Sequence, residues 1–410
     1  NVLVPAQISY SRGADGIVTS PAIHRINQLK GKLVAATQFT ESDFFIRYLA
    51  TQADIGVNML TDPGARLADD KINMVYCSDG EAVAKLLTSD AQSATPALAG
   101  GVTWAPFTTD AVKDSGGKLV LLTTNKNLLI IADILIVNKG FADAHPEMVT
   151  GLVDGLLTGN QAVTQNPEQF ADLLAKAFSV KEDHWDRSKA LAELKKVHLS
   201  NLPENLAFFQ GGIADGGSFA SIYQSAVLAY GPTLLPNPPD SDRFLSLAGL
   251  KAAQASGAYA AQTASLVPLK SGASNPIEKD PLLSRDIRFY YEPNSDEVDP
   301  ANSGNVANLE SIKKMLDVSP GSTILLRGHV DPSNMEEFRK NGGEKLVQTM
   351  ALKAMDLSKR RAADIKNLLV TREKIDPARL ETVGAGWGEP ASKTNPDLNR
   401  RVEVQWFTLE

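Results

Sequence analysis

Short apolar runs alternate with helical patterns along residues 1–247, and this alternation constrains the fold more than any other feature. Short apolar runs between polar turns predict strands. They occur at 33–36, 72–75, 101–103, 119–122 and 134–137. Between these runs, segments with a helical pattern predict helices at 42–54, 80–88, 107–114, 146–164, 167–177 and 186–197. Strands that alternate with helices are typical of an α/β domain.

The composition changes after residue 247. Residues 249–280 are rich in Ala, Ser and Gly, and residues 272–276 read as a linker. We therefore expect a first domain at 1–247, a linker region at 248–280 and a second domain at 281–410. In the second domain the patterns predict strands and helices in the order β-α-β-α-β-β, a small α+β fold. The predicted elements are strand 287–291, helix 302–316, strand 323–330, helix 355–371, and strands 380–383 and 401–407.

The bulk composition excludes several classes of protein. The formal charge of −7, without a basic stripe, argues against a nucleic-acid-binding protein. No run reaches the roughly 18 apolar residues that a transmembrane helix needs. With one cysteine, Cys77, and five histidines without metal-ligand spacing, we expect neither a metal site nor a cofactor. The first residue is Asn, which fits a mature or truncated chain without its export signal.

Five ordered motifs in the second domain carry a resemblance. They are "RFYYEPNSDEVDP", "ILLRGHVD", "LSKRRAADI", "VGAGWGEP" and "NRRVEVQW". In this order they resemble the OmpA-like peptidoglycan-binding domain, over residues 285–410. The resemblance implies that Asp331 and Arg361 hold the free amino-acid end of diaminopimelate in a peptidoglycan stem peptide. A carboxylate and a forked guanidinium suit a zwitterion, although Asp331 as a loop cap and Arg361 as a surface ion-pair partner remain the alternative.

The second domain departs from that family at two places. Residues 332–356 form a polar insertion between the two charged positions, which we expect to be a loop that changes affinity or ligand choice more than fold. The family's Asn before the "LS" pair is replaced by Ala354, so Asn334 or Asn341 could supply the missing hydrogen bond. Of Arg400 and Arg401, one would support the pocket and the other the fold.

The first domain resembles the periplasmic solute-binding proteins of the nitrate, sulfonate and taurine type, over residues 8–235. The resemblance rests on "SRGADGIV", "LKGKLVAATQFTESDFFIRYLA", "NMVYCSDGEAVAKLL", "GVTWAPFT", "ADILIVNKGFADAHPEMV", "FFQGG" and "SFASIYQSAVLAYG". It implies two lobes with a small solute between them. Such proteins begin with a further strand-helix-strand unit, so that unit was either removed or left out here, or the domain is incomplete and its pocket altered.

Several residues are candidates for contact with the solute. Thr40 and Ser42 open a predicted helix after a strand, where hydroxyl and backbone N–H groups would stabilise an anion or simply cap the helix. Ser78 and Asp79 begin another helix, with capping again the alternative. Trp104 at a strand end would be a pocket wall or a core ring. The remaining candidates are Asp133 at a strand start and Asp15, which the family resemblance places near the mouth of the cleft together with Gly13 and Ala14.

Together these features predict a periplasmic cell-envelope protein that captures a small anionic solute for transport or sensing, and an anchor upstream of residue 1 would associate it with the outer membrane. Its partners would be diaminopimelate-type peptidoglycan and a membrane transporter of the ABC class. The alternative is a structural or interaction protein whose first domain no longer binds a solute. We expect no enzymatic activity. A thiamine-pyrimidine synthase shares this α/β fold, but that class of enzyme relies on a cysteine-rich motif, and this sequence has only Cys77. The sequence also suggests no Ser-His-Asp or paired-acid constellation for another reaction.

Overall fold

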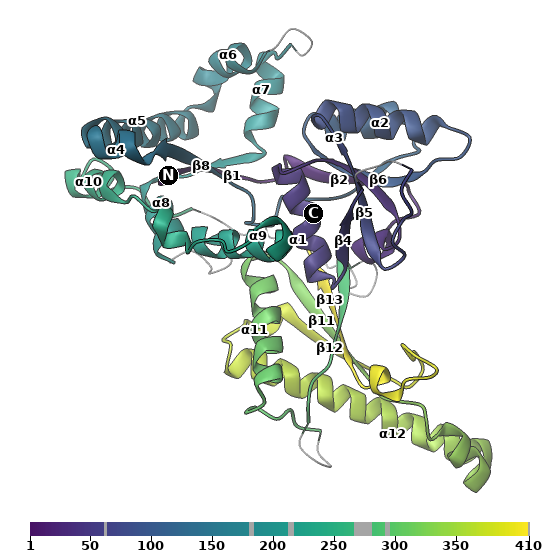
Figure 1. Cartoon of the computed structure of the whole chain (residues 1–410). Helices are drawn as coiled ribbons and strands as arrows, with labels where there is room; N and C mark the ends of the chain where they lie inside the picture. Colours follow the sequence, from purple (N-terminus) through teal and green to yellow (C-terminus); the bar gives the residue numbers. More distant parts are fainter. Residues whose placement is uncertain (61–63, 180–183, 212–216, 266–280, 292–295, 409–410) are drawn as a thin grey trace.

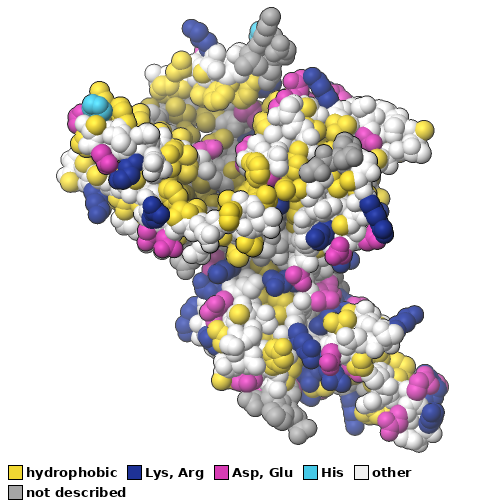
Figure 2. Space-filling model, viewed as in Figure 1, with side chains coloured by type: hydrophobic (Ala, Val, Ile, Leu, Met, Phe, Trp, Pro, Cys, Tyr) yellow, Lys and Arg dark blue, Asp and Glu magenta, His cyan; other side chains and the backbone are white. Residues whose placement is uncertain are grey.

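The computed structural model describes residues 1–60, 64–179, 184–211, 217–265, 281–291 and 296–408. It contains two lobes side by side and a C-terminal domain below them (Figure 1). One lobe is built on a six-stranded sheet and the other on a three-stranded sheet, and we call them the large-sheet lobe and the small-sheet lobe. Figure 2 shows a hollow between the two lobes, and a dense mixture of charged side chains on the C-terminal domain.

The large-sheet lobe has the strand order β4-β5-β3-β6-β2-β7. Strands β4, β5, β3 and β6 are parallel, whereas β2 and β7 add antiparallel pairs at one side. Helix α1 buries Phe45, Ile46 and Leu49, which place an apolar stripe on the sheet. Its elements are β2 (Asp15–Thr19), η1 (Ile26–Leu29), β3 (Leu33–Thr37), α1 (Glu41–Gln52), β4 (Gly56–Met59), β5 (Lys71–Cys77), α2 (Gly80–Gln92), β6 (Leu98–Trp104), α3 (Phe107–Asp114) and β7 (Val120–Thr124).

The small-sheet lobe has the antiparallel order β8-β1-β9. Strand β1 continues directly into β2, so residues 12–14 form one crossing between the lobes, and residues 125–131 between β7 and β8 form another. Across the described residues, helices that are both long and apolar enough to cross a membrane are lacking. The elements are β1 (Val2–Ser11), β8 (Ala132–Asn138), α4 (Lys139–Ala144), α5 (Pro146–Gln165), α6 (Pro167–Phe178), α7 (Arg187–Leu194), β9 (Val197–Leu199), α8 (Leu202–Gln210), α9 (Phe219–Leu234), η3 (Ser241–Phe244) and α10 (Ala248–Ser256).

Residues 248–265, in the region that the sequence predicts as a linker, pack against the small-sheet lobe. Leu250 and Ala253 of α10 are buried in one cluster with Val153 of α5. The Tyr259 hydroxyl donates to a carboxylate oxygen of Asp154 over 2.8 Å. This part of the chain is therefore a wall of the lobe. The predicted linker residues 266–280 lie outside the described residues.

The C-terminal domain is a four-stranded sheet of order β10-β13-β11-β12 with two helices, as the predicted β-α-β-α-β-β order requires. The first strand precedes the predicted position 287–291 and ends where that prediction begins. Strands β11 and β12 are parallel, with α12 between them in sequence. The elements are β10 (Leu283–Ile287), α11 (Ser303–Asp317), β11 (Thr323–His329), α12 (Met335–Thr371), η4 (Pro377–Arg379), β12 (Leu380–Gly386), η5 (Pro396–Asn399) and β13 (Val402–Phe407).

The insertion 332–356 is mostly helical, so the prediction of a loop is wrong. Helix α12 begins at Met335 and extends away from the sheet (Figure 1). Glu, Lys, Leu, Met and Ala are frequent in the insertion, and these residues favour helices. Only Gly342 and Gly343 leave helical geometry, with φ of +62° at Gly343, and there the helix kinks. Phe338 stacks on Trp387, with ring centroids 6.1 Å apart.

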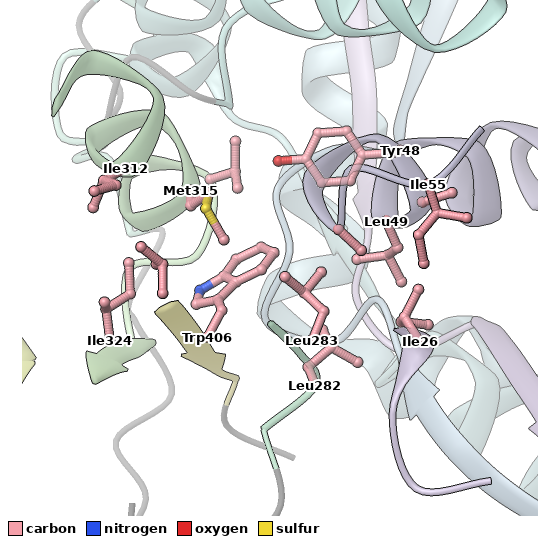
Figure 3. Packing of buried hydrophobic residues seen from close by; sticks show 14 of the residues in the cluster. Ile26, Tyr48, Leu49, Ile55, Leu282, Leu283, Ile312, Met315, Ile324 and Trp406 are labelled. Carbon is pink, nitrogen blue, oxygen red and sulfur yellow. The ribbon is translucent and has the colours of Figure 1, made fainter. Parts of the chain in front are cut away.

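The C-terminal domain and the large-sheet lobe share one buried hydrophobic cluster. From the lobe, Tyr48 and Leu49 on α1 reach the interface, where Trp406 and Met315 of the C-terminal domain meet them (Figure 3). Trp406 is fully buried. Removal of this much apolar surface from water is the main force that holds the two domains together.

Backbone hydrogen bonds also cross this interface. The Ile26 N–H donates to the Leu282 carbonyl over 2.9 Å, and the Leu129 N–H donates to the Val318 carbonyl over 2.8 Å. The Asn27 side chain bonds both backbone groups of Ser284, at 2.7 and 2.8 Å. The two domains are thus docked as one body, which a flexible tether alone would not produce.

Candidate binding sites

The Asp331 carboxylate lies just beyond the end of β11, where several groups fix it. Asn399, itself buried, donates to one oxygen over 3.2 Å, and the Ser333 hydroxyl donates to the other. Arg400 comes within 3.8 Å. Burial raises the pKa of Asp331, but the hydrogen bonds from Ser333 and Asn399 outweigh it and hold the pKa below its usual value. The side chain therefore presents a fixed negative charge.

Arg361 lies on α12, one turn after Ser358, which packs closely against β11. A Cβ on Gly328 would come within 2.1 Å of the Ser358 carbonyl oxygen, so only glycine permits this approach. The Arg361 guanidinium stacks on Tyr291, 4.4 Å from the ring centroid. Its Nε is buried and has no hydrogen-bond partner in the described structure. Within the described residues Arg361 forms no ion pair, neither with Asp331 nor with another acid.

The other residues predicted to contact peptidoglycan or to support its pocket lie in different surroundings. Arg400 lies near Asp331, whereas Arg401 pairs with Asp286 of β10 at 3.0 Å and so ties two strands together. Asn334 precedes the first turn of α12 and makes no side-chain cap there. Ala354 is buried. Sequence reasoning missed Asn399 and Tyr291, although both lie within the motifs that carried the resemblance.

A second group of charges lies on the C-terminal sheet. Ligand atoms of His329, Glu389 and Glu403 lie within 4.8 Å of one another. Arg327 already pairs with Glu389 at 2.9 Å and approaches Glu403 at 3.7 Å. Burial raises the pKa of Glu403, but His329, Gln405 and Arg327 together lower it to about 2. With an arginine cation among the acids, we interpret this cluster as a structural ion-pair network.

In the large-sheet lobe, the start of α1 is occupied by the protein itself. The Thr40 hydroxyl turns back to the Thr37 carbonyl over 2.7 Å and makes no cap. The Phe39 N–H donates to the Asp43 carboxylate over 3.1 Å. Ser42 is fully buried, and its Oγ has no partner among the described residues. Asp43 therefore already accepts the Phe39 N–H at this helix N-terminus, so that group is not available to a bound anion.

A buried charged pair that sequence reasoning missed continues from Asp43. Arg47 donates through Nε to Asp43 over 2.8 Å, and through Nη2 to the Tyr76 hydroxyl over 2.7 Å. Its guanidinium lies 5.0 Å from the centre of the Tyr230 ring on α9. Burial, followed by the charge of Asp43, raises the pKa of Tyr76 to about 12. This network links α1, β5 and α9.

Ser78, Asp79 and Trp104 have local structural roles. The Ser78 hydroxyl donates to Asp79, which caps α2 by accepting from the Ala82 N–H over 2.8 Å. These bonds hold the pKa of Asp79 below its usual value. Trp104 covers the start of α2, since a Cβ on Gly80 would meet its ring at 2.8 Å. The ligand role of all three stays a prediction.

Asp15 and Asp133 lie beside the crossing between the lobes. Asn125 ties the crossing together, since its Oδ1 accepts from the Gly13 and Asp15 N–H groups and its Nδ2 donates to the Ser11 carbonyl. Asp133 accepts from Ser9 on the neighbouring strand. Asp15 is 2% exposed, and in the part of the chain that the structure describes its Oδ1 has no hydrogen-bond partner. Burial, reinforced by the charges of Glu41 and Asp133, raises the pKa of Asp15 to about 7.

Asp15→Asn should change how stability depends on pH. The raised pKa means that the folded protein holds this proton more tightly than the unfolded chain, so the free energy of unfolding falls as pH rises from about 4 to about 7. The variant should lose this fall and be more stable at pH 8, by on the order of 4 kcal/mol. Urea denaturation at several pH values measures it. The exposed Asp70→Asn is the control, and a wild-type-like pH profile in Asp15→Asn would contradict the assignment.

Comparison with known proteins gives matches for both parts of the chain. Residues 290–403 match the family described as the OmpA family. Two curated relatives are outer membrane proteins Omp38 of Acinetobacter baumannii strains, 25% identical over 134 residues (32% of this chain and 33% of theirs) and 24% identical over 168 residues (39% and 42%). The chain thus spans well under half the length of these relatives.

Solved structures are also similar to parts of the chain. The periplasmic aliphatic sulphonate binding protein SsuA of Escherichia coli is 16% identical, with a TM-score of 0.41, over 59% of this chain and 72% of that one. The peptidoglycan-associated lipoprotein of Burkholderia pseudomallei is 20% identical, with a TM-score of 0.23, over 32% and 99%. The family match shows that the C-terminal part of this chain is an OmpA-family domain.

Proposed function

We propose that this chain is a cell-envelope protein that binds peptidoglycan through its C-terminal domain and a small solute through its two lobes. The binding of the cell wall has the stronger support. The observation that carries it is Arg361, a cation stacked on Tyr291 without an acidic partner in the described structure. A guanidinium whose Nε is shielded from water and unbonded is ready to bind an oxyanion.

The proposed ligand is the zwitterionic end of a diaminopimelate stem peptide. Arg361 would bind its carboxylate, and Asp331, which Asn399 and Ser333 hold ionised, would bind its ammonium group. Because each contact is charge-assisted, each contributes roughly 1.5–3 kcal/mol to affinity. The two groups together would read the order of ammonium and carboxylate. Arg400 would support the Asp331 carboxylate. Asn334, directly before α12, would lie near the same ligand.

Co-sedimentation of the full chain with diaminopimelate-type peptidoglycan tests this proposal. Asp331→Asn and Arg361→Gln should each weaken binding at least about tenfold, the equivalent of 1.4 kcal/mol. Arg360→Gln is the matched control, because Arg360 is the adjacent arginine and already pairs with Asp296 and Asp356. The control should bind as the wild type does. Full binding by both Asp331→Asn and Arg361→Gln would refute the site.

In this proposal the two lobes bind a small solute in the periplasm and serve its transport or sensing together with a membrane transporter. Tethering to the wall would keep the captured solute near that partner. The candidate contacts are Thr40, Ser42, Ser78, Asp79, Trp104, Asp15 and Asp133. At the start of α1 the Asp43 carboxylate already accepts the Phe39 N–H, and this favours a second possibility, in which this domain no longer binds an anion and serves as an interaction module.

A thermal-shift screen of the full chain separates these two functions. Phosphate, nitrate, bicarbonate and alkanesulfonates form one arm, and small amines and neutral amides form the other. A ligand that binds only the folded protein raises Tm with its concentration. A shift with an anion supports capture of an anionic solute. If every anion leaves Tm unchanged, the anionic solute is excluded and the interaction module becomes the better function.

A further inference from the structure

We propose that a cavity inside the small-sheet lobe binds a compact monocarboxylate with an apolar body. The cavity has a volume of about 460 Å³, within the range of small-molecule sites. It lies among the end of α5, the start of α6, helix α7 and strand β9. Its apolar walls come from Val163, Leu191, Leu194, Val197 and Leu199. None of the seven residues proposed above for the solute lines it, so this site is separate from that one.

A buried acid orients a histidine in the lining of the cavity. His198 lines the cavity, and its Nε2 lies 3.0 Å from a carboxylate oxygen of Glu204. The Glu204 side chain is 1% exposed, and it also accepts from the N–H groups of Asn201 and Ser265. Burial raises the pKa of Glu204, but the bond from His198 and these N–H groups outweigh it and keep the pKa low. An ionised Glu204 requires the proton of His198 to lie on Nε2, which orients the ring through one edge.

Two amides in the lining have one end engaged and the other end available. The Gln262 carbonyl oxygen accepts from the Leu202 N–H over 3.0 Å, so the geometry of its amide is fixed while its Nε2 has no partner in the described structure. The Asn160 amide donates to the carbonyls of Ile8 and Ser200, over 2.8 and 2.9 Å. The Gln262 amide can therefore donate to a ligand, and the Asn160 oxygen can accept from one.

The charges around the cavity favour a carboxylate over an amine. Glu168 of the lining is already neutralised by Arg187, at 2.8 Å. Lys195 lines the cavity and forms no ion pair with any described residue. The negative charge of Glu204 faces His198, the Asn201 and Ser265 N–H groups and the Ser265 hydroxyl. Among the described lining groups, the Lys195 ammonium and the Gln262 amide donor are available to a ligand, and together they suit one carboxylate.

The position of the cavity connects it to the crossing between the lobes. Strand β9 forms one wall and pairs with the end of β1, with Ser11 opposite Val197. The Arg12 N–H, in the crossing itself, donates to the Lys196 carbonyl over 2.7 Å. A ligand that orders this wall would therefore also order the segment from which β2 starts.

Isothermal titration calorimetry and thermal shift of the full chain with benzoate and isovalerate test the site, with benzamide as the neutral isostere of benzoate. Benzoate or isovalerate should bind and raise Tm, and benzamide should bind at least about tenfold more weakly. Equal binding of benzoate and benzamide would exclude the carboxylate class. No binding by any of the three would overturn the proposal.

Two test variants, Leu191→Trp and Gln262→Ala, and one control variant, Leu173→Trp, show whether the ligand binds in this cavity. Leu191→Trp fills the cavity and should abolish benzoate binding, whereas Leu173→Trp, at a 63% exposed position on α6, should leave it intact. Gln262→Ala removes the amide donor without adding bulk, and it should raise the benzoate Kd about tenfold. Unchanged benzoate affinity in Gln262→Ala would refute the site even if Leu191→Trp does not fold. Peptidoglycan binding should be unaffected by both variants, so the two proposals fail independently.

Discussion

Trp406→Ala is expected to lower the free energy of unfolding by about 3–5 kcal/mol and to destabilise the large-sheet lobe together with the C-terminal domain. Trp406 is fully buried at the junction of the two. Figure 3 shows its ring beside Met315 and Leu283 of the C-terminal domain, with Tyr48 and Leu49 of α1 nearby. Removal of the indole leaves a cavity in a cluster that both domains share, so both lose packing.

Differential scanning calorimetry of the full chain measures this effect. The wild-type C-terminal domain and large-sheet lobe should unfold in one shared transition, which moves to lower temperature in Trp406→Ala. Leu352→Ala is the control in the same domain, because Leu352 is 70% exposed and its loss should change Tm little. Two separate transitions, with the one for the lobe unmoved by Trp406→Ala, would contradict the docking of the domains.

Arg47→Met is expected to cost about 3–5 kcal/mol of unfolding free energy, because it leaves a buried carboxylate without its cation. The side chain of Asp43 is 0% exposed and that of Arg47 is 4% exposed. The Tyr76 hydroxyl oxygen also loses the hydrogen bond that it accepts from Arg47. Urea denaturation followed by circular dichroism gives the difference directly.

The double variant Asp43→Asn/Arg47→Met provides the matched control. It removes both charges, so the cost of an unpaired buried ion disappears and part of the lost stability should return. The Phe39 N–H can still bond the asparagine oxygen. If the double variant is no more stable than Arg47→Met, the loss comes from packing of the arginine side chain against Tyr230, and the ion pair contributes little.

The sequence predicted those elements whose pattern is local. Strands β3, β5, β6, β7 and β8 and the order of the C-terminal domain follow from short apolar runs and helical periodicity. Strand β1 was missed, because the polar residues Gln7, Ser9 and Ser11, all buried, interrupt its apolar pattern. The helix in the insertion was missed because its polar composition suggested a loop, whereas the insertion is mostly helical and its two adjacent glycines only kink the helix.

The candidate sites were predictable to different degrees. Asp331 and Arg361 could be singled out because ordered motifs surround them. The buried pair of Asp43 and Arg47 has an ordinary i,i+4 spacing on a helix, which is indistinguishable in sequence from an exposed surface pair. The cavity beside His198 depends on contacts of Gln262 and Glu204 with residues far apart in the chain. No local pattern encodes such contacts.

The contact between Asn27 and Ser284 affects how a C-terminal fragment of this protein would behave. Strand β10 is the outer strand of the C-terminal sheet, and Asn27 satisfies both backbone groups of Ser284 at its rim. A fragment that begins near residue 281 would expose these groups together with the apolar surface around Trp406. Bare strand edges invite pairing between molecules. We therefore expect such a fragment to self-associate more than the intact chain, which is the better choice for measuring wall binding.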